Sequence, residues 1–195
     1  MITFLAIGPN GSFAEYVVVD PQLAIRVPDS WSFEEAAQLG GAGITACLAL
    51  YYVQALPTPL APASKPIDLL VWGASSSTGQ YVVQMAHQAG LRVIATASPK
   101  NFKLVKGFGA DDVFDYRDEL TPTKIKELTG GKLKHVVDCI SEGDTGDKIA
   151  EAIGDEGGEV STLLAYESKR SDVKNLSFRG YEIFGKVCAS NNKQP

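Results

Sequence analysis

The turn after the apolar segment 69–72 carries the side chains best suited to chemistry in this chain. It reads Gly73-Ala74-Ser75-Ser76-Ser77-Thr78-Gly79, with four consecutive hydroxyl side chains between its glycines. Glycine lets the backbone approach a ligand closely, and a helix beginning near Thr78 offers unpaired N–H groups and a positive dipole end. The turn therefore predicts a cradle for a dinucleotide pyrophosphate. Its spacing departs from G-x-G-x-x-G, so a purely structural turn is the alternative.

The residues on both sides of this turn complete a strand–helix–strand unit. Apolar side chains at helical spacing follow over residues 81–86, Gly90 marks the end of the helix, and residues 91–97 are an apolar run typical of a second strand. Dinucleotide-binding folds place their phosphate turn in such a unit. This context favours the phosphate cradle over the structural turn.

The end of the second predicted strand bears on the choice of dinucleotide. NAD-binding folds usually have an acidic residue there, which binds the adenosine ribose. This chain instead has Ser98, Pro99, Lys100 and Asn101, which supply hydroxyl, ammonium and amide donors and no acid. These groups suit the additional phosphate of NADP. In the alternative interpretation, Ser98 and Asn101 only cap the next helix and Lys100 is solvated.

Two further polar residues follow or end predicted strands. Tyr116 comes directly after residues 113–115, where its ring could flank an adenine or its hydroxyl could reach a phosphate. A tyrosine in a surface turn is the alternative. Asp138 ends the strand predicted over 135–140, and we expect it to bond to the local turn rather than to a ribose.

Composition and cysteine placement exclude several classes of function. The 195 residues carry a net charge of −5 and scattered lysines, which argues against nucleic acid as a partner. The apolar run at residues 1–7 is too short to span a membrane. The three cysteines have no C-x-x-C spacing, and the two histidines, His87 and His135, are expected in solvent, so we predict no metal site. An odd cysteine count without a secretory leader predicts a cytoplasmic protein.

Alternating strand and helix patterns predict an α/β fold with a doubly wound parallel sheet over residues 67–195. Before it, we expect strands at 4–7, 13–19 and 24–27, within an N-terminal β segment of residues 1–30. Residues 31–66 are a connection: a capping box at 32–35 begins a helix to about 39, glycines at 40–43 interrupt it, a second helix covers 44–55, and a proline-rich link follows. Beyond residue 98 we expect helices at 101–108, 121–129 and 145–153, and strands at 113–115, 135–140, 159–164 and 181–187.

Several short motifs run along the chain besides the turn. They are Gly11-Ser12-Phe13-Ala14-Glu15-Tyr16, Ile25-Arg26-Val27-Pro28, Glu34-Glu35-Ala36-Ala37, Gly43-Ile44-Thr45-Ala46, Gly109-Ala110-Asp111-Asp112-Val113-Phe114-Asp115-Tyr116-Arg117 and Val137-Asp138-Cys139-Ile140. By these motifs the sequence resembles the medium-chain dehydrogenase/reductases, in particular their zinc-free quinone and enoyl reductases. A narrower likeness, to fungal trans-acting enoyl reductases that serve polyketide synthases, is carried by Ser98-Pro99-Lys100-Asn101-Phe102, Phe114-Asp115-Tyr116-Arg117 and Ile183-Phe184-Gly185.

This resemblance implies an NADPH-dependent oxidoreductase that transfers hydride to an activated double bond of an enoyl thioester or a quinone-like acceptor. It implies that Ser75, Ser76, Ser77 and Thr78 bind the pyrophosphate, that Ser98 to Asn101 and Tyr116 bind the adenosine phosphate end, and that Thr162 and Leu163 approach the nicotinamide. Thr45, Ile183, Phe184 and Gly185 would line the substrate side.

The resemblance also implies that residues 1–30 are the remnant of a GroES-like domain and that the chain is truncated. A dinucleotide-binding module with little turnover is therefore the alternative function, and a zinc alcohol dehydrogenase relative is a third. No catalytic residue and no oligomeric state are assigned from the sequence.

Overall fold

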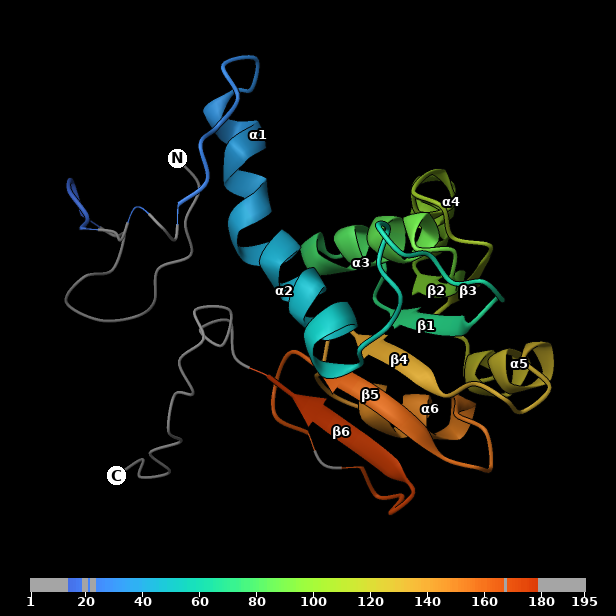
Figure 1. Cartoon of the computed structure of the whole chain (residues 1–195). Helices are drawn as coiled ribbons and strands as arrows, with labels where there is room; N and C mark the ends of the chain where they lie inside the picture. The colour runs from blue at the N-terminus through green and yellow to red at the C-terminus, as the bar shows by residue number, and fades with distance from the viewer. Residues whose placement is uncertain (1–13, 19–20, 22–23, 167, 179–195) are drawn as a thin grey trace, which may run out of the picture. The chain divides into compact units, whose positions relative to one another are not determined.

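The structure is a computed structural model that describes residues 14–18, 21, 24–166 and 168–178 (Figure 1). The chain divides into two compact units. One comprises Thr45–Phe178, and the other comprises Met1–Ile44 with Arg179–Pro195. Nearly all of the regular structure in the described residues belongs to the Thr45–Phe178 unit, and this unit carries the candidate site.

A six-stranded parallel sheet forms the centre of the Thr45–Phe178 unit. Its order is β3-β2-β1-β4-β5-β6, so the chain runs outward from β1 in one direction and then outward from β4 in the other. This order confirms the predicted doubly wound fold. The strands are β1 (Asp68–Trp72), β2 (Arg92–Ala97), β3 (Asp112–Asp115), β4 (His135–Asp138), β5 (Gly158–Thr162) and β6 (Val173–Ser177).

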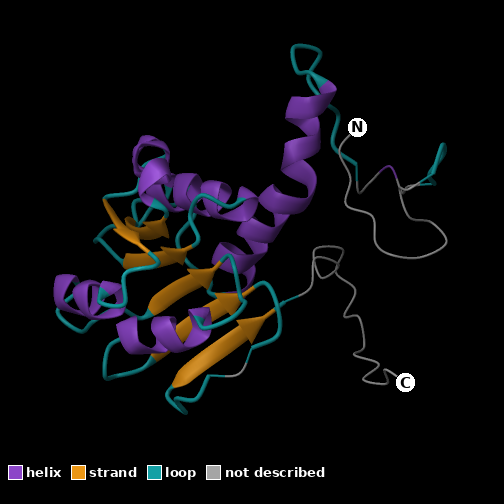
Figure 2. Cartoon of the chain, turned by 180° about the vertical axis from the view of Figure 1, so that it is seen from behind, coloured by secondary structure: helices purple, strands orange, loops and turns teal. Residues whose placement is uncertain are grey.

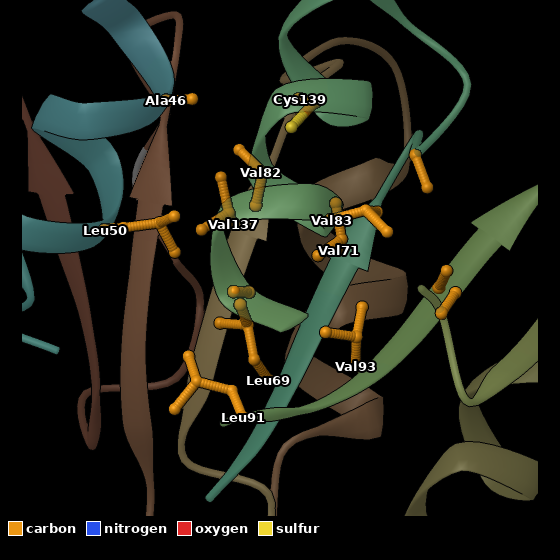
Figure 3. Packing of buried hydrophobic residues seen from close by; sticks show 14 of the residues in the cluster. Ala46, Leu50, Leu69, Val71, Val82, Val83, Leu91, Val93, Val137 and Cys139 are labelled. Carbon is orange, nitrogen blue, oxygen red and sulfur yellow. The ribbon is translucent and has the colours of Figure 1, made fainter. Parts of the chain in front are cut away.

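Helices cover both faces of this sheet (Figures 1 and 2). Leu69 and Val71 of β1 face a core that α3 closes, and Figure 3 shows this packing. Leu70 and Trp72 face a second core, which α5 and α6 complete. Each such buried side chain contributes roughly 1.5–3 kcal/mol. The helices are α2 (Ile44–Cys47), η3 (Leu48–Val53), α3 (Ser77–Gln88), η4 (Pro99–Asn101), α4 (Phe102–Gly107), α5 (Thr121–Leu128) and α6 (Thr145–Ala152).

The described part of the other unit contains the predicted capping box. Helix α1 (Phe33–Gln38) begins after Ser32, whose Oγ accepts the Glu35 N–H at 3.1 Å while the Glu35 carboxylate accepts the Ser32 N–H at 2.8 Å. The glycines at 40–43 do not interrupt the helical path as predicted. They lie in a π-helical stretch, η2 (Leu39–Gly43), in which the helical path continues through wider turns.

The helical stretch Phe33–Val53 is long and apolar enough to be a candidate membrane span by length and composition. Its last part contains Leu48, Ala49 and Leu50, which are almost fully buried in the Thr45–Phe178 unit. Burial in the core accounts for the apolar side chains of this last part, whereas Phe33 and Tyr52 expose 86% and 60% of their surfaces.

The strands expected at 13–19 and 24–27 are not formed by the described residues of those segments. Residues 14–18 are irregular, and only Ile25 makes a single bridge. Tyr16, Val18 and Ile25 expose 89, 83 and 64% of their surface. A strand is stable only with a paired neighbour and a buried face, which the described residues do not supply here. The strand expected at 4–7 lies outside the described residues.

Strand β6 is the element that the sequence pattern does not predict. Val173 is buried, but Lys174, Asn175 and Ser177 give the segment too few apolar side chains for a strand pattern. Its place beside β5 is what makes it a strand, because pairing there satisfies its backbone groups. The last strand predicted, at 181–187, lies outside the described residues.

A buried glutamine joins the end of η3 to the sheet. The Gln54 Nε2 donates to the Val136 carbonyl at 2.8 Å and to the Ser161 Oγ at 2.9 Å, and the Ser161 hydroxyl donates to the Ala49 carbonyl at 3.0 Å. The Gln54 Oε1 is left to accept from the His135 Nδ1 at 3.1 Å. His135 is thus half-buried and not solvated as expected, since β4 pairs with neighbours on both sides.

We expect this histidine to make stability depend on pH. Burial lowers the pKa of His135, with a further lowering by Lys134 and an opposing effect of Glu159. A lowered pKa means that the unfolded chain binds a proton first, so the free energy of unfolding falls as the pH drops from neutral through the ordinary histidine pKa of about 6.5. Urea unfolding at several pH values measures this decrease, which His135→Gln should reduce and His87→Gln should leave in place.

Candidate functional site

A cavity of about 420 Å³ lies at the carboxyl ends of the central strands. It opens where the strand order reverses between β1 and β4, which is where doubly wound sheets bind ligands. A volume of this size accommodates part of a dinucleotide. Its lining comes from β1 and the following turn (Trp72, Gly73, Ser75 and Ser76), from the end of β2 (Ala97 and Ser98), and from segments after β3 and β4 (Tyr116, Ile140, Asp144 and Thr145).

The turn between β1 and α3 is fixed by its own backbone. Gly73 has φ +77°, a conformation that favours glycine, and its N–H donates to the Thr96 Oγ1 at 3.0 Å. The Ser76 N–H donates to the Gly73 carbonyl at 3.0 Å, and the Ser76 Oγ caps α3 by accepting the Gly79 N–H at 3.1 Å. A Cβ on Gly79 would lie 2.4 Å from the Gly73 carbonyl oxygen. Helix and turn therefore meet as closely as two backbones can.

The predicted cradle residues divide into those that reach the cavity and those that do not. Gly73, Ser75 and Ser76 line it, and Ser77 and Thr78 are outside the lining, with Ser77 exposed at the first position of α3. The first N–H groups of a helix have no partner within the helix, and its dipole favours an anion there. This end of the cavity is therefore suited to phosphate.

The segment after β2 contributes one side chain to the cavity lining. Ser98 lines the cavity at the N-cap position of η4 (Pro99–Asn101), where its side chain makes no capping hydrogen bond. Lys100 is exposed and makes no ion pair with any of the described residues. An ammonium group that follows a cavity-lining serine by two residues and makes no ion pair in the described part of the chain is available to an anionic ligand.

Tyr116 lines the same cavity, and 43% of its surface is exposed. The neighbouring Arg117 guanidinium lies 5.7 Å from the centre of the Tyr116 ring and makes two bonds to the Asp115 carboxylate, at 3.0 and 2.9 Å. These bonds lower the pKa of Asp115, whose charge Arg117 offsets. The acidic residue that ends β3 is thus already paired.

Asp138 holds the turn after β4, as expected. Its carboxylate accepts the Ile140 and Ser141 N–H groups at 3.0 and 2.9 Å and the Thr145 hydroxyl at 2.9 Å. Burial raises the pKa of Asp138, although these three donors oppose that effect. The bonds set the path by which Ile140 and Thr145 reach the cavity.

Thr162 and Leu163, expected near a nicotinamide, follow β5 and do not line the cavity. Thr162 is almost fully buried, and its hydroxyl has no hydrogen-bond partner among the described residues. The Leu163 N–H donates to the Ser141 Oγ at 2.9 Å. Thr45 lies half-buried in α2, apart from this lining, and Ile183, Phe184 and Gly185 lie outside the described residues.

Four lining residues were not candidates in the sequence. Asp144 and Thr145 lie at the start of α6, and a helix start after a predicted strand was the signal that could have located them. Ile140 lies in the segment 138–141 after a predicted strand, where ligand contacts are expected, and it lines the cavity. Trp72 and Ala97 belong to the buried strand ends and are read from the sequence as core.

Comparison with known proteins gives consistent matches. The sequence profile of zinc-binding dehydrogenases matches residues 77–194. The chain is 47% identical over 184 residues to trans-enoyl reductase RAP1 of Pyricularia oryzae, and 43% identical over 158 residues to trans-enoyl reductase buaC of Petromyces alliaceus. The matches cover 91% and 80% of this chain but 51% and 44% of those proteins, so the chain spans about half the length of these relatives.

The fold has a close counterpart among solved structures. The JamJ enoyl reductase in its apo form superposes with a TM-score of 0.71 at 25% identity, over 86% of this chain and 50% of that one. In the described ranges, no three His, Cys, Asp or Glu side chains are grouped so as to hold a metal ion. The described residues therefore supply no ligand set for the zinc in the name of the matching profile.

Proposed function

Because the chain belongs to the zinc-binding dehydrogenase family, we propose that it is the cofactor-binding half of an NADPH-dependent reductase that transfers hydride to an activated double bond. The resemblance to fungal trans-acting enoyl reductases is confirmed by relatives of that name. The proposal rests above all on one observation: Gly73, Ser75, Ser76 and Ser98, from two strand ends, line a single cavity at the switch point of the sheet.

The residues present fit a dinucleotide. Because Gly79 has no Cβ, the start of α3 packs directly on the Gly73 carbonyl. A pyrophosphate can therefore bind to the backbone of the turn and to the first N–H groups of the helix. When bound, NADPH supplies the hydride. The role of this chain is to hold and orient the cofactor. Ser75 and Ser76, assisted by Ser77 and Thr78, bind the pyrophosphate at the start of α3.

The additional phosphate of NADP is assigned to the segment after β2. Ser98 in the cavity wall supplies a donor, and so does Lys100 two residues later, which has no ion pair among the described residues. Pro99 and Asn101 shape the turn, and Tyr116 flanks it. The nearest strand-end carboxylate, that of Asp115, is paired with Arg117 and so repels a phosphate less. Thr162 and Leu163 are assigned to the nicotinamide side, where the buried Thr162 hydroxyl lacks a partner among the described residues.

Replacement of Lys100 by alanine is expected to weaken NADPH binding roughly tenfold and to change NADH binding little. A hydrogen bond to a charged group contributes about 1.5–3 kcal/mol, and about 1.4 kcal/mol corresponds to tenfold. Fluorescence titration with both dinucleotides measures the ratio. Lys103→Ala, which removes an exposed lysine of α4, is the matched control. Equal losses of affinity for NADPH and NADH would show that Lys100 does not bind the additional phosphate of NADPH.

We assign the acceptor to the class of enoyl thioesters carried by a polyketide synthase, in the cytoplasm. A quinone-like acceptor of the same hydride is the nearest chemical alternative. Residues 1–30 are assigned to the remnant of a GroES-like domain, and Thr45, Ile183, Phe184 and Gly185 to the substrate side. Because the chain spans about half of its relatives, a binding module with little turnover is the second candidate function.

One pair of measurements separates these functions. Titration of the chain with NADPH tests binding, and NADPH oxidation with an enoyl thioester or a quinone tests hydride transfer. Binding with turnover of the thioester supports the reductase, and binding without turnover of either acceptor supports the module. Absence of NADPH binding would overturn both.

A further inference from the structure

The polar groups of the cavity wall differ in what they can still bind. The Thr145 hydroxyl already donates to Asp138, whereas the Ser76 Oγ, which accepts the Gly79 N–H, keeps its own hydrogen to donate. Hydroxyl groups such as those of Ser75 and Ser98 can donate to phosphate oxygens. Asp144 is the one carboxylate among the described lining residues, and a carboxylate only accepts. Its partner in a bound ligand must therefore be a donor.

Asp144 is held in place at the start of α6. The Lys148 Nζ lies 3.1 Å from the Asp144 Oδ2 and 3.1 Å from the Glu119 Oε1, and only 14% of the Lys148 side chain is exposed. The Asp144 side chain is 70% exposed, and among the described residues only its Oδ2 has an ion-pair partner, so Oδ1 is open to a ligand. The network joins the segment after β3 to α6 at the cavity.

Beside Asp144, the cavity presents apolar surface suited to a flat ring. Tyr116 and Ile140 line it and expose 43 and 40% of their surfaces, although they are large apolar side chains. Exposed apolar surface of this kind in a pocket favours a heterocycle, which stacks on an aromatic face. Of the parts of NADP, the adenine ring fits these walls.

The choice of donor on the ligand follows from topology and charge. The adenosine ribose of a dinucleotide lies at the end of β2, and Asp144 follows β4, on the other side of β1. A carboxylate is repelled by the phosphates assigned to Ser75 and Ser98. The remaining donor on the adenosine half is the exocyclic amine of adenine.

We therefore propose that Asp144 is a specificity residue that accepts a hydrogen bond from the exocyclic amine of the adenine ring. This inference rests on the proposed function, because it requires that the cavity bind NADPH. It assigns base selectivity to a side chain outside the phosphate cradle. A dinucleotide in which the amine is replaced by a carbonyl should be disfavoured, since two acceptors then face each other.

The test is titration of the full chain with NADPH and with reduced nicotinamide hypoxanthine dinucleotide phosphate, in which a carbonyl replaces the amine. Fluorescence of Trp72, which lines the cavity, can report binding. We expect the wild-type chain to bind the hypoxanthine form about tenfold more weakly than NADPH. Asp144→Asn should weaken NADPH binding and improve binding of the hypoxanthine form, because an amide can donate to the carbonyl.

Glu142→Gln is the matched control, since it removes the same charge from an exposed residue two positions earlier that does not line the cavity. It should keep the wild-type preference for adenine. Equal affinities of the wild-type chain for both dinucleotides, or an unchanged ratio in Asp144→Asn, would overturn the assignment of Asp144 alone. Absence of NADPH binding would overturn the proposed function itself.

Discussion

Replacing Gly79 by alanine is expected to lower the free energy of unfolding by about 1–3 kcal/mol and to weaken NADPH binding by more than about tenfold. The new Cβ would lie 2.4 Å from the Gly73 oxygen and 2.8 Å from the Ala74 Cα. Both are backbone atoms, so no rotamer change relieves the contact, and α3 must move away from the turn. That movement breaks the bond between the Gly79 N–H and the Ser76 Oγ and shifts the N–H groups assigned to the pyrophosphate.

The same substitution at Gly107 is the control for this prediction. Gly107 ends α4, and a Cβ there has no heavy atom within 4 Å. Alanine in a helix is favoured over glycine by roughly 0.5–1 kcal/mol, so Gly107→Ala should unfold at equal or higher urea concentration and bind NADPH as the wild type does. A Gly79→Ala variant with the stability and affinity of the wild type would contradict the close approach of helix and turn.

The part of the fold that local sequence determines was predictable. The run from β1 through α3 to β2 combines an apolar strand, a capping serine and a terminating glycine, and these features act within a few residues of one another. For the same reason the sequence predicts that Gly73, Ser75 and Ser98 lie at strand ends. Strand ends in a parallel sheet converge on one edge whatever lies between them.

Features that depend on distant partners were not predictable from the sequence. Strand β6 exists through its pairing with β5 rather than through its own composition. The half-burial of His135 likewise follows from its bond to Gln54, which lies 81 residues earlier in the chain.

Arg170 is the second residue whose loss should have a large effect, because its guanidinium closes the carboxyl end of α6. Its two terminal nitrogens donate to the carbonyls of Ala150, Ile153 and Gly154 at 2.7, 3.1 and 2.9 Å, and Asp172 pairs with the same group. The last carbonyls of a helix lack partners within it, and a cation there also interacts favourably with the dipole. One planar group thus donates to three carbonyls and one carboxylate at once.

Arg170→Ala should therefore lower the free energy of unfolding by about 2–3 kcal/mol, since each buried carbonyl left without a donor costs about 1–3 kcal/mol and water replaces only some donors. Arg170→Lys should recover part of the loss, because a single ammonium group cannot reproduce the fork. Lys124→Ala, which removes an exposed ion pair with Asp118, should cost less than about 1 kcal/mol in the same urea titration. If Arg170→Ala cost no more stability than Lys124→Ala, the carbonyls of α6 would be satisfied without Arg170. Arg170 would then not stabilise α6, whose start lines the cavity through Asp144 and Thr145.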